Sequence, residues 1–123
     1  MVMKKVLVVD DSAVDTQNLQ RILVDAGWQV ITAASGADAI VKAKIELPSL
    51  IMMDVNMPGL DGFSAMRQLS QDPATKGIPV VFVTGKDQNA DRMFAQMLGA
   101  KAFVTKPYTS DQILRTSDRF QYV

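Results

Sequence analysis

The fold is decided by the stretch Leu50-Ile51-Met52-Met53-Asp54-Val55-Asn56-Met57-Pro58-Gly59, in which four apolar residues lead directly to one carboxylate. An apolar run this short that is followed by turn residues is typical of a strand buried on both faces of a sheet. Such a strand delivers Asp54 to the edge of the sheet, where a carboxylate can react or bind a metal ion. We therefore expect the rest of the chain to supply Asp54 with polar neighbours.

Four further segments share this apolar character, and segments with helical periodicity separate them. The predicted strands are 5–9, 28–33, 50–53, 79–83 and 101–105, and a helix follows each of them, the last over 110–120. Strands that are apolar throughout and alternate with helices indicate an α/β fold with a parallel sheet covered on both faces. In such a sheet, ligands bind at the carboxyl ends of the strands, where the strand order reverses. The 123 residues fit one domain over 1–123.

Helix starts and ends are marked by polar and glycine residues. Ser12 is predicted to cap the first helix, with Asp15 at the third helical position as its capping-box partner, and Gly27 is predicted to end that helix. The second helix is predicted to begin at Ser35 and to turn Leu47 toward the core.

The composition excludes several kinds of chemistry. The chain has 13 basic and 13 acidic side chains, no cysteine and no histidine. Disulfides, zinc sites, thiol nucleophiles and histidine bases are therefore excluded. Zero net charge argues against nucleic acid as a direct partner. The N-terminal apolar run is too short for a signal peptide or a membrane span, which favours a cytoplasmic protein.

Polar residues follow the apolar strands at one edge of the predicted sheet. Asp10-Asp11, Asp54, Thr84 and Lys106 each follow a different strand. Any one of them is an ordinary strand end, but together they indicate a site. Gathered carboxylates repel one another and need compensation by Lys106 and a divalent cation, for which Mg²⁺ is the first candidate. Such a site suits phosphoryl transfer, with Asp54 as nucleophile and the Thr84 hydroxyl as a hydrogen-bond donor.

The motifs resemble those of response-regulator receiver domains, the family of the chemotaxis regulator CheY. The resemblance is carried over the whole chain by Val-Val-Asp10-Asp11-Ser, Met-Asp54-Val-Asn56-Met-Pro58-Gly-Leu-Asp-Gly62, Val-Thr84-Gly and Thr-Lys106-Pro107. It implies a flavodoxin-like, doubly wound (βα)5 fold with strand order 2-1-3-4-5. It also implies a two-component signalling switch in which Asp54 accepts a phosphoryl group from a phosphohistidine. The loops further resemble those of single-domain receivers in pilus and twitching-motility chemosensory systems.

The resemblance also assigns roles within the site. Asp10, Asp11, Asp54 and the main-chain carbonyl of Asn56 would hold Mg²⁺, or Mn²⁺ in its place. The side chains of Thr84 and Lys106 would contact the phosphoryl group.

Further roles concern the response to phosphorylation. Thr84 and Phe103 would form the switch, and the Lys106-Pro107 peptide bond would be cis. Asn56 and Lys86 would modulate the lifetime of the phosphate. Phe103 lacks the hydroxyl that a tyrosine would bring to the switch.

The expected partners are proteins. Because the chain has no histidine, the phosphohistidine must belong to a sensor histidine kinase or a phosphotransfer protein. A downstream target is expected on the face formed by the fourth helix, fifth strand and fifth helix. Most methionines are expected in the core, whereas Met57, Met93 or Met97 are candidates for a partner surface.

Two alternatives compete with a phosphorylated receiver. An aspartyl-phosphate phosphatase on a similar fold would use an Asp-x-Asp pair after the first strand, whereas Asp10 and Asp11 are adjacent here. A degenerate receiver that binds partners without phosphate would lack site residues. We expect no enzyme activity beyond the chain's own phosphorylation and dephosphorylation.

Overall fold

The computed structural model describes residues 4–85 and 89–121. Its five parallel strands form one sheet in the predicted order, β2-β1-β3-β4-β5. The strands are β1 (Lys5–Val9), β2 (Gln29–Ala33), β3 (Leu50–Met53), β4 (Val80–Thr84) and β5 (Ala102–Thr105). The helices are α1 (Ala13–Asp25), α2 (Gly36–Glu46), α3 (Gly62–Gln71), α4 (Asn89–Met97) and α5 (Ser110–Gln121). Within the described ranges, no helix is long and apolar enough to cross a membrane.

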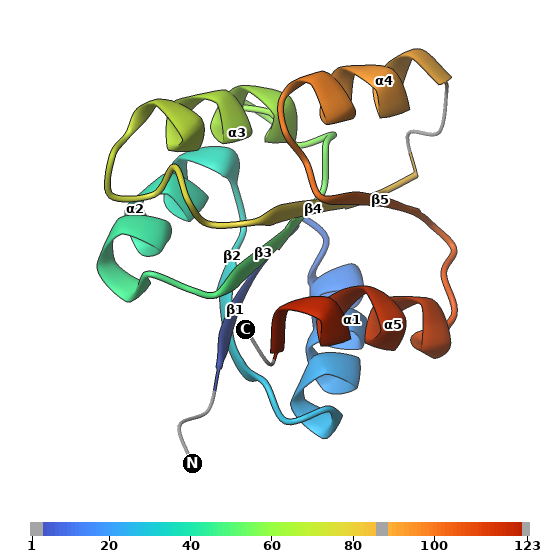
Figure 1. Ribbon diagram of the computed structural model, residues 1–123. Helices are drawn as coiled ribbons and strands as arrows, with labels where there is room; N and C mark the ends of the chain where they lie inside the picture. Colours follow the sequence, from blue (N-terminus) through green and yellow to red (C-terminus); the bar gives the residue numbers. More distant parts are fainter. Residues whose placement is uncertain (1–3, 86–88, 122–123) are drawn as a thin grey trace.

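The sheet lies between two helical layers. Helices α1 and α5 cover one face, and α2, α3 and α4 cover the other (Figure 1). Every residue of β3 and β4 is buried, because apolar side chains pack on both faces of these central strands. The strand order reverses between β1 and β3, so the carboxyl ends of these two strands mark the switch point of the fold.

The start of α1 follows only half of the predicted capping box. Ser12 caps the helix, and its hydroxyl accepts a hydrogen bond from the Asp15 backbone N–H at 3.3 Å. The predicted second bond of the capping box, from the Ser12 N–H to the Asp15 carboxylate, is wrong. The Ser12 N–H donates to Asp10 Oδ1 at 2.9 Å. The Asp15 carboxylate instead accepts a hydrogen bond from Lys106. A cation at the strand edge thus competes successfully for the carboxylate.

Two side chains lie differently from their predicted positions. Leu47 does not turn toward the core but is 58% exposed, because it ends α2 in the left-handed conformation with φ of 46°. Met57 is buried, so the hypothesis that it lies on a partner surface is wrong. Met93 and Met97 of α4 are exposed, as a partner surface requires.

Candidate functional site

Four strands place polar side chains at one edge of the sheet. The backbone pairing continues one residue beyond the strands: Asp10 N–H donates to Ala33 O at 3.1 Å, Asp54 N–H to Val9 O at 2.9 Å, and Lys106 N–H to Thr84 O at 2.9 Å. These bonds fix the backbone from which the polar side chains extend. The site therefore rests on the rigid sheet rather than on free loops.

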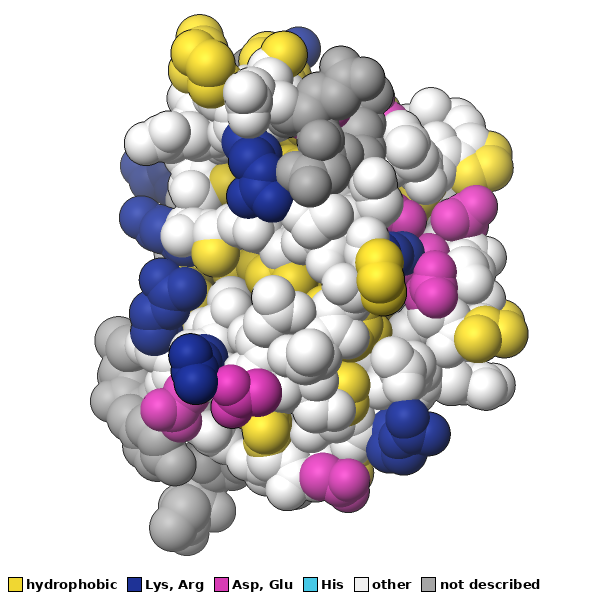
Figure 2. All heavy atoms as spheres, turned by 90° about the vertical axis from the view of Figure 1, so that its right-hand side faces the viewer, with side chains coloured by type: hydrophobic (Ala, Val, Ile, Leu, Met, Phe, Trp, Pro, Cys, Tyr) yellow, Lys and Arg dark blue, Asp and Glu magenta, His cyan; other side chains and the backbone are white. Residues whose placement is uncertain are grey.

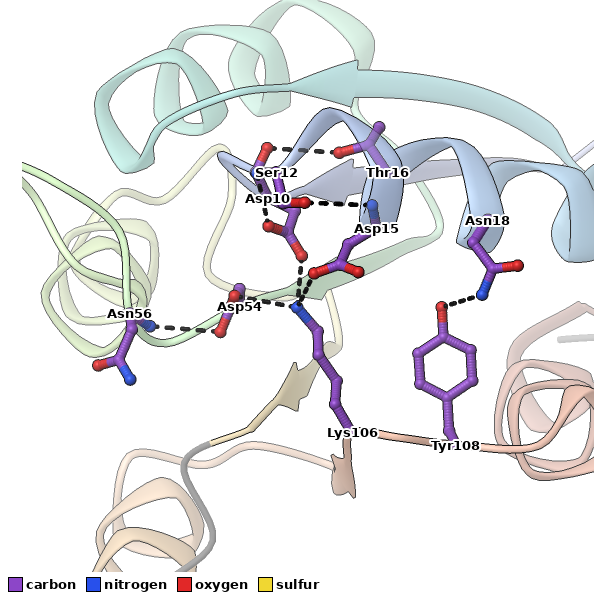
Figure 3. A network of polar contacts seen from close by, with 9 residues as sticks. All are labelled: Asp10, Ser12, Asp15, Thr16, Asn18, Asp54, Asn56, Lys106 and Tyr108. Carbon is purple, nitrogen blue, oxygen red and sulfur yellow. Dashed lines mark hydrogen bonds and ion pairs between the residues drawn. The ribbon is translucent and has the colours of Figure 1, made fainter.

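Lys106 joins three carboxylates at the centre of this edge (Figure 3). Its Nζ lies 2.7 Å from Asp10 Oδ2, 3.0 Å from Asp15 Oδ2 and 3.1 Å from Asp54 Oδ2. The Lys106, Asp10 and Asp54 side chains are only 18%, 8% and 10% exposed. The space-filling view shows acidic side chains gathered around a basic one on the surface of this edge (Figure 2).

Burial and charge act against each other in this cluster. Burial raises the pKa of the Asp10 carboxyl above its usual range, and the hydrogen bond from Lys106 opposes that shift. Burial by itself lowers the pKa of Lys106, but its bonds to Asp10 and Asp15 outweigh that effect and leave the pKa well above its usual value. Lys106 is therefore a permanent cation that does not fully compensate the carboxylates around it.

The donor set fits a hard divalent cation. Asp10, Asp11 and Asp54 each place a carboxylate oxygen within 4.8 Å of the others. Asp10 and Asp54 are buried, whereas Asp11 is exposed. Oxygen ligands around an excess of negative charge are what Mg²⁺ prefers. Asn56 lies beside the cluster, and its N–H donates to Asp54 Oδ1 at 3.3 Å.

Gly62 allows α3 to pack directly against the backbone of this site. Its N–H donates to Val55 O at 2.8 Å. A Cβ atom at this position would lie 2.2 Å from the main-chain oxygen of Asp54. Only glycine therefore permits this close approach, which supports the segment that follows Asp54.

Thr84 and Phe103 lie on the neighbouring strands β4 and β5. Thr84 is fully buried at the end of β4. Phe103 is half-buried, with its ring centroid 6.5 Å from that of Phe82 and 4.9 Å from the Arg92 guanidinium. Arg92 also donates a hydrogen bond to the Thr105 hydroxyl at 2.5 Å. The ring of Phe103 thus connects the core of the sheet with α4.

Two further predicted positions have different outcomes. The Lys106–Pro107 peptide bond is cis in the structure. Lys86 lies outside the described residues.

Asp15 is the site residue that sequence reasoning missed, since we assigned it to the helix cap. It stands in the first turn of α1, the helix that follows β1 and Asp10. A signal was available: side chains in a helix lean toward its N-terminus, which here faces the carboxyl ends of the strands. An acidic residue at that position is therefore placed to reach a cation at the same edge.

Comparison with known proteins gives a consistent result. The response regulator receiver domain family matches residues 6–118. The protein PilH of Pseudomonas aeruginosa is 41% identical over 114 residues, which covers 93% of this chain and 94% of PilH. The structure of Vibrio cholerae chemotaxis protein CheY4 is 33% identical with a TM-score of 0.90, covering 97% of this chain and 99% of CheY4.

A third match concerns the fold. The receiver domain of the sensor histidine kinase PA1611 of Pseudomonas aeruginosa has a TM-score of 0.90 and 24% identity, and covers 99% of this chain and 100% of that domain. That structure holds a magnesium ion coordinated in its active-site cleft. At this identity the match shows the same fold.

Proposed function

The chain belongs to the response regulator receiver domain family, whose members are phosphorylation-dependent switches of two-component signalling, and we propose that Asp54 is its phosphoacceptor. The observation that carries this proposal is the position of Asp54 Oδ2, which lies 3.1 Å from Lys106 Nζ and within the carboxylate cluster. The Lys106 cation can bind an oxygen of a phosphoryl group. The neighbouring Asp54 oxygen can then attack the phosphorus atom of that group.

The transfer itself is a displacement at phosphorus. An Asp54 carboxylate oxygen forms a bond to phosphorus, and the bond from phosphorus to the donor's imidazole nitrogen breaks. The electron pair of that bond leaves with the imidazole, and Asp54 carries an acyl phosphate. Lys106 donates a hydrogen bond to one phosphoryl oxygen, and the Thr84 hydroxyl donates to another once it turns toward the group.

Four groups would hold Mg²⁺ in this site, namely the carboxylates of Asp10, Asp11 and Asp54 and the main-chain carbonyl of Asn56. Mn²⁺ also accepts such oxygen ligands. The ion would supply positive charge that offsets the charge on the phosphoryl oxygens.

The switch carries the signal from Thr84 to the surface. Movement of the Thr84 hydroxyl onto a phosphoryl oxygen vacates space beside β5, and the ring of Phe103 moves inward into it. The ring then leaves the Arg92 guanidinium, which is 4.9 Å from its centroid in this structure. Because Arg92 belongs to α4, the surface of that helix changes with the state of Asp54.

The partners are proteins on both sides of this switch. The donor is a sensor histidine kinase or a phosphotransfer protein. The downstream target binds the face formed by α4, β5 and α5. An open groove of about 520 Å³ on this face is lined by Arg92, Phe103 and Arg115 among others. The exposed Met93 and Met97 add adaptable apolar contacts to α4.

Asn56 and Lys86 set the lifetime of the acyl phosphate in this proposal. Both stand two residues after a site residue, Asp54 and Thr84 respectively. Lys86 brings a positive charge, which would shield the acyl phosphate from water. Lys86→Ala therefore changes the dephosphorylation rate more than replacement of the exposed Lys44 does, as measured by phosphate decay.

The proposed phosphorylation is tested with Mg²⁺ and acetyl phosphate as donor. Mass measurement is expected to show one added phosphoryl group on the wild-type chain and none on Asp54→Asn. Peptide mapping then locates the group on Asp54. Steady release of phosphate from varied substrates would instead indicate a phosphatase, and an unchanged mass would indicate a receiver that works without phosphate.

A further inference from the structure

The ammonium group of Lys106 is fully engaged before any phosphoryl group is present. A lysine has three N–H donors, and Lys106 has an acceptor for each of them on Asp10, Asp15 and Asp54. A phosphoryl oxygen that binds Lys106 must therefore replace one of these carboxylates. The question is which one leaves.

Burial distinguishes the three carboxylates. The side chains of Asp10 and Asp54 are 8% and 10% exposed, whereas that of Asp15 is 45% exposed. Asp10 and Asp54 also belong to the metal-binding cluster, to which Asp15 does not belong. A carboxylate that is already half in water is released at the lowest cost, because water replaces its lost hydrogen bond.

We propose that Asp15 is a positioning residue that holds Lys106 in the unphosphorylated site and is exchanged for a phosphoryl oxygen. The proposal rests on the function proposed above. The exchange replaces one hydrogen-bond acceptor of Lys106 by another, and the proton stays on Lys106. Because Asp15 both occupies an N–H of Lys106 and repels a dianion nearby, it opposes entry of the phosphoryl group. It thereby limits phosphorylation by stray small donors.

The loop that carries Lys106 has anchors besides Asp15. One turn further along α1, Asn18 Nδ2 donates a hydrogen bond to the Tyr108 hydroxyl at 3.1 Å (Figure 3). The backbone of Lys106 is also tied to Thr84 O at 2.9 Å. Replacement of Asp15 is therefore expected to free the ammonium group without releasing the loop.

Asp38 provides a matched control for Asp15. Each is the third residue of its helix, and each donates its backbone N–H to the hydroxyl of a serine N-cap, Ser12 for Asp15 and Ser35 for Asp38. The Asp38 carboxylate pairs with Lys42 of its own helix at 3.2 Å. Asp38→Asn thus makes the same change of charge and helix position away from Lys106.

The experiment measures phosphoryl binding in two ways. The first is the rate of phosphorylation over a range of acetyl phosphate concentrations, followed by mass. The second is the dissociation constant of beryllofluoride with Mg²⁺, which occupies the phosphoryl position without transfer. Asp15→Asn is expected to raise the rate at low donor and to tighten beryllofluoride binding, each by about three- to tenfold. Asp15→Glu should restore the wild-type values, and Asp38→Asn should leave them unchanged.

The outcomes separate this proposal from the one on which it rests. If the wild-type chain takes up neither probe, the proposed function fails. If the wild type is phosphorylated but Asp15→Asn behaves as Asp38→Asn does, or binds beryllofluoride more weakly, the role of Asp15 is overturned. Thermal unfolding shows whether each variant is folded. Asp15→Ser, which keeps a small polar residue in the first turn, takes the place of an unfolded Asp15→Asn.

Discussion

At the scale of single residues, Lys106 compensates carboxylates that would otherwise repel one another in a poorly solvated site. Lys106→Ala is expected to lower the free energy of unfolding by about 1–3 kcal/mol at neutral pH, since it leaves buried charge unpaired near the surface. The loss should shrink as the pH falls toward 5. Uncompensated carboxylates bind protons more tightly in the folded state than in the unfolded state, so acid restores stability.

Urea unfolding at the two pH values measures this effect. The control is Lys44→Ala, because Lys44 pairs with Asp72 at 3.1 Å with its side chain 51% exposed. A surface pair of this kind contributes about 1 kcal/mol or less. Equal losses for the two variants would contradict the central role of Lys106 in the stability of the site.

Tyr108 gives a second prediction at this scale, through its ionisation. Burial raises the pKa of its hydroxyl above the ordinary value. The folded state therefore favours the neutral phenol, and this contribution to stability is complete below about pH 10 and is lost as the pH rises above it. An absorbance titration of the tyrosinate should show one ionisation phase at a higher pH than that of a free tyrosine. Tyr108→Phe should remove this phase, and its persistence would disprove the assignment.

At the scale of elements, the contact between α3 and the end of β3 depends on Gly62. A Cβ there would stand 2.2 Å from Asp54 O and 3.0 Å from Val55 Cα, and both atoms belong to backbone that cannot turn away. Gly62→Ala is expected to lower the free energy of unfolding by about 1–3 kcal/mol, as overpacking does. It should also weaken phosphorylation of Asp54, since the displaced backbone carries that residue.

Gly77→Ala is the matched control for this substitution. No atom lies within 4 Å of a Cβ at position 77. Loss of backbone freedom in the unfolded chain makes such a change neutral or stabilising by up to about 1 kcal/mol. Both variants are compared by chemical unfolding. Similar stabilities would show that α3 shifts freely away from the site.

The strands and helices could be predicted from the sequence because the same local pattern recurs along the chain: an apolar strand followed by polar residues. Strand β3 and the first four residues of β4 are continuously apolar, which is possible only under cover on both faces. The role of Asp15 could not be predicted in this way, because it depends on a contact with Lys106, 91 residues away. Leu47 was misplaced for a related reason: its left-handed backbone turns it out of the helical pattern that predicted its burial.

At the scale of the whole molecule, the ends of β1 and β3 and the loop after β5 bring their charged side chains together in one cluster. The carboxylates of Asp10, Asp11 and Asp54 follow two strands that are distant in the sequence, and they converge to within 4.8 Å only in the folded chain. A cation that binds this cluster therefore binds the folded state and not the unfolded one. By mass action, its binding must stabilise the entire fold.

Mg²⁺ at 100 times its dissociation constant is therefore expected to raise the free energy of unfolding by about 2.7 kcal/mol, and chelation should remove the gain. Asp11→Asn is the sharpest test, because Asp11 is exposed and its replacement leaves the core intact. Its stability without metal should stay near that of the wild type, while the gain from Mg²⁺ becomes much smaller. Thermal unfolding with and without Mg²⁺ measures both quantities. A full gain in Asp11→Asn would mean that the ion binds elsewhere, since the other two carboxylates already share Lys106.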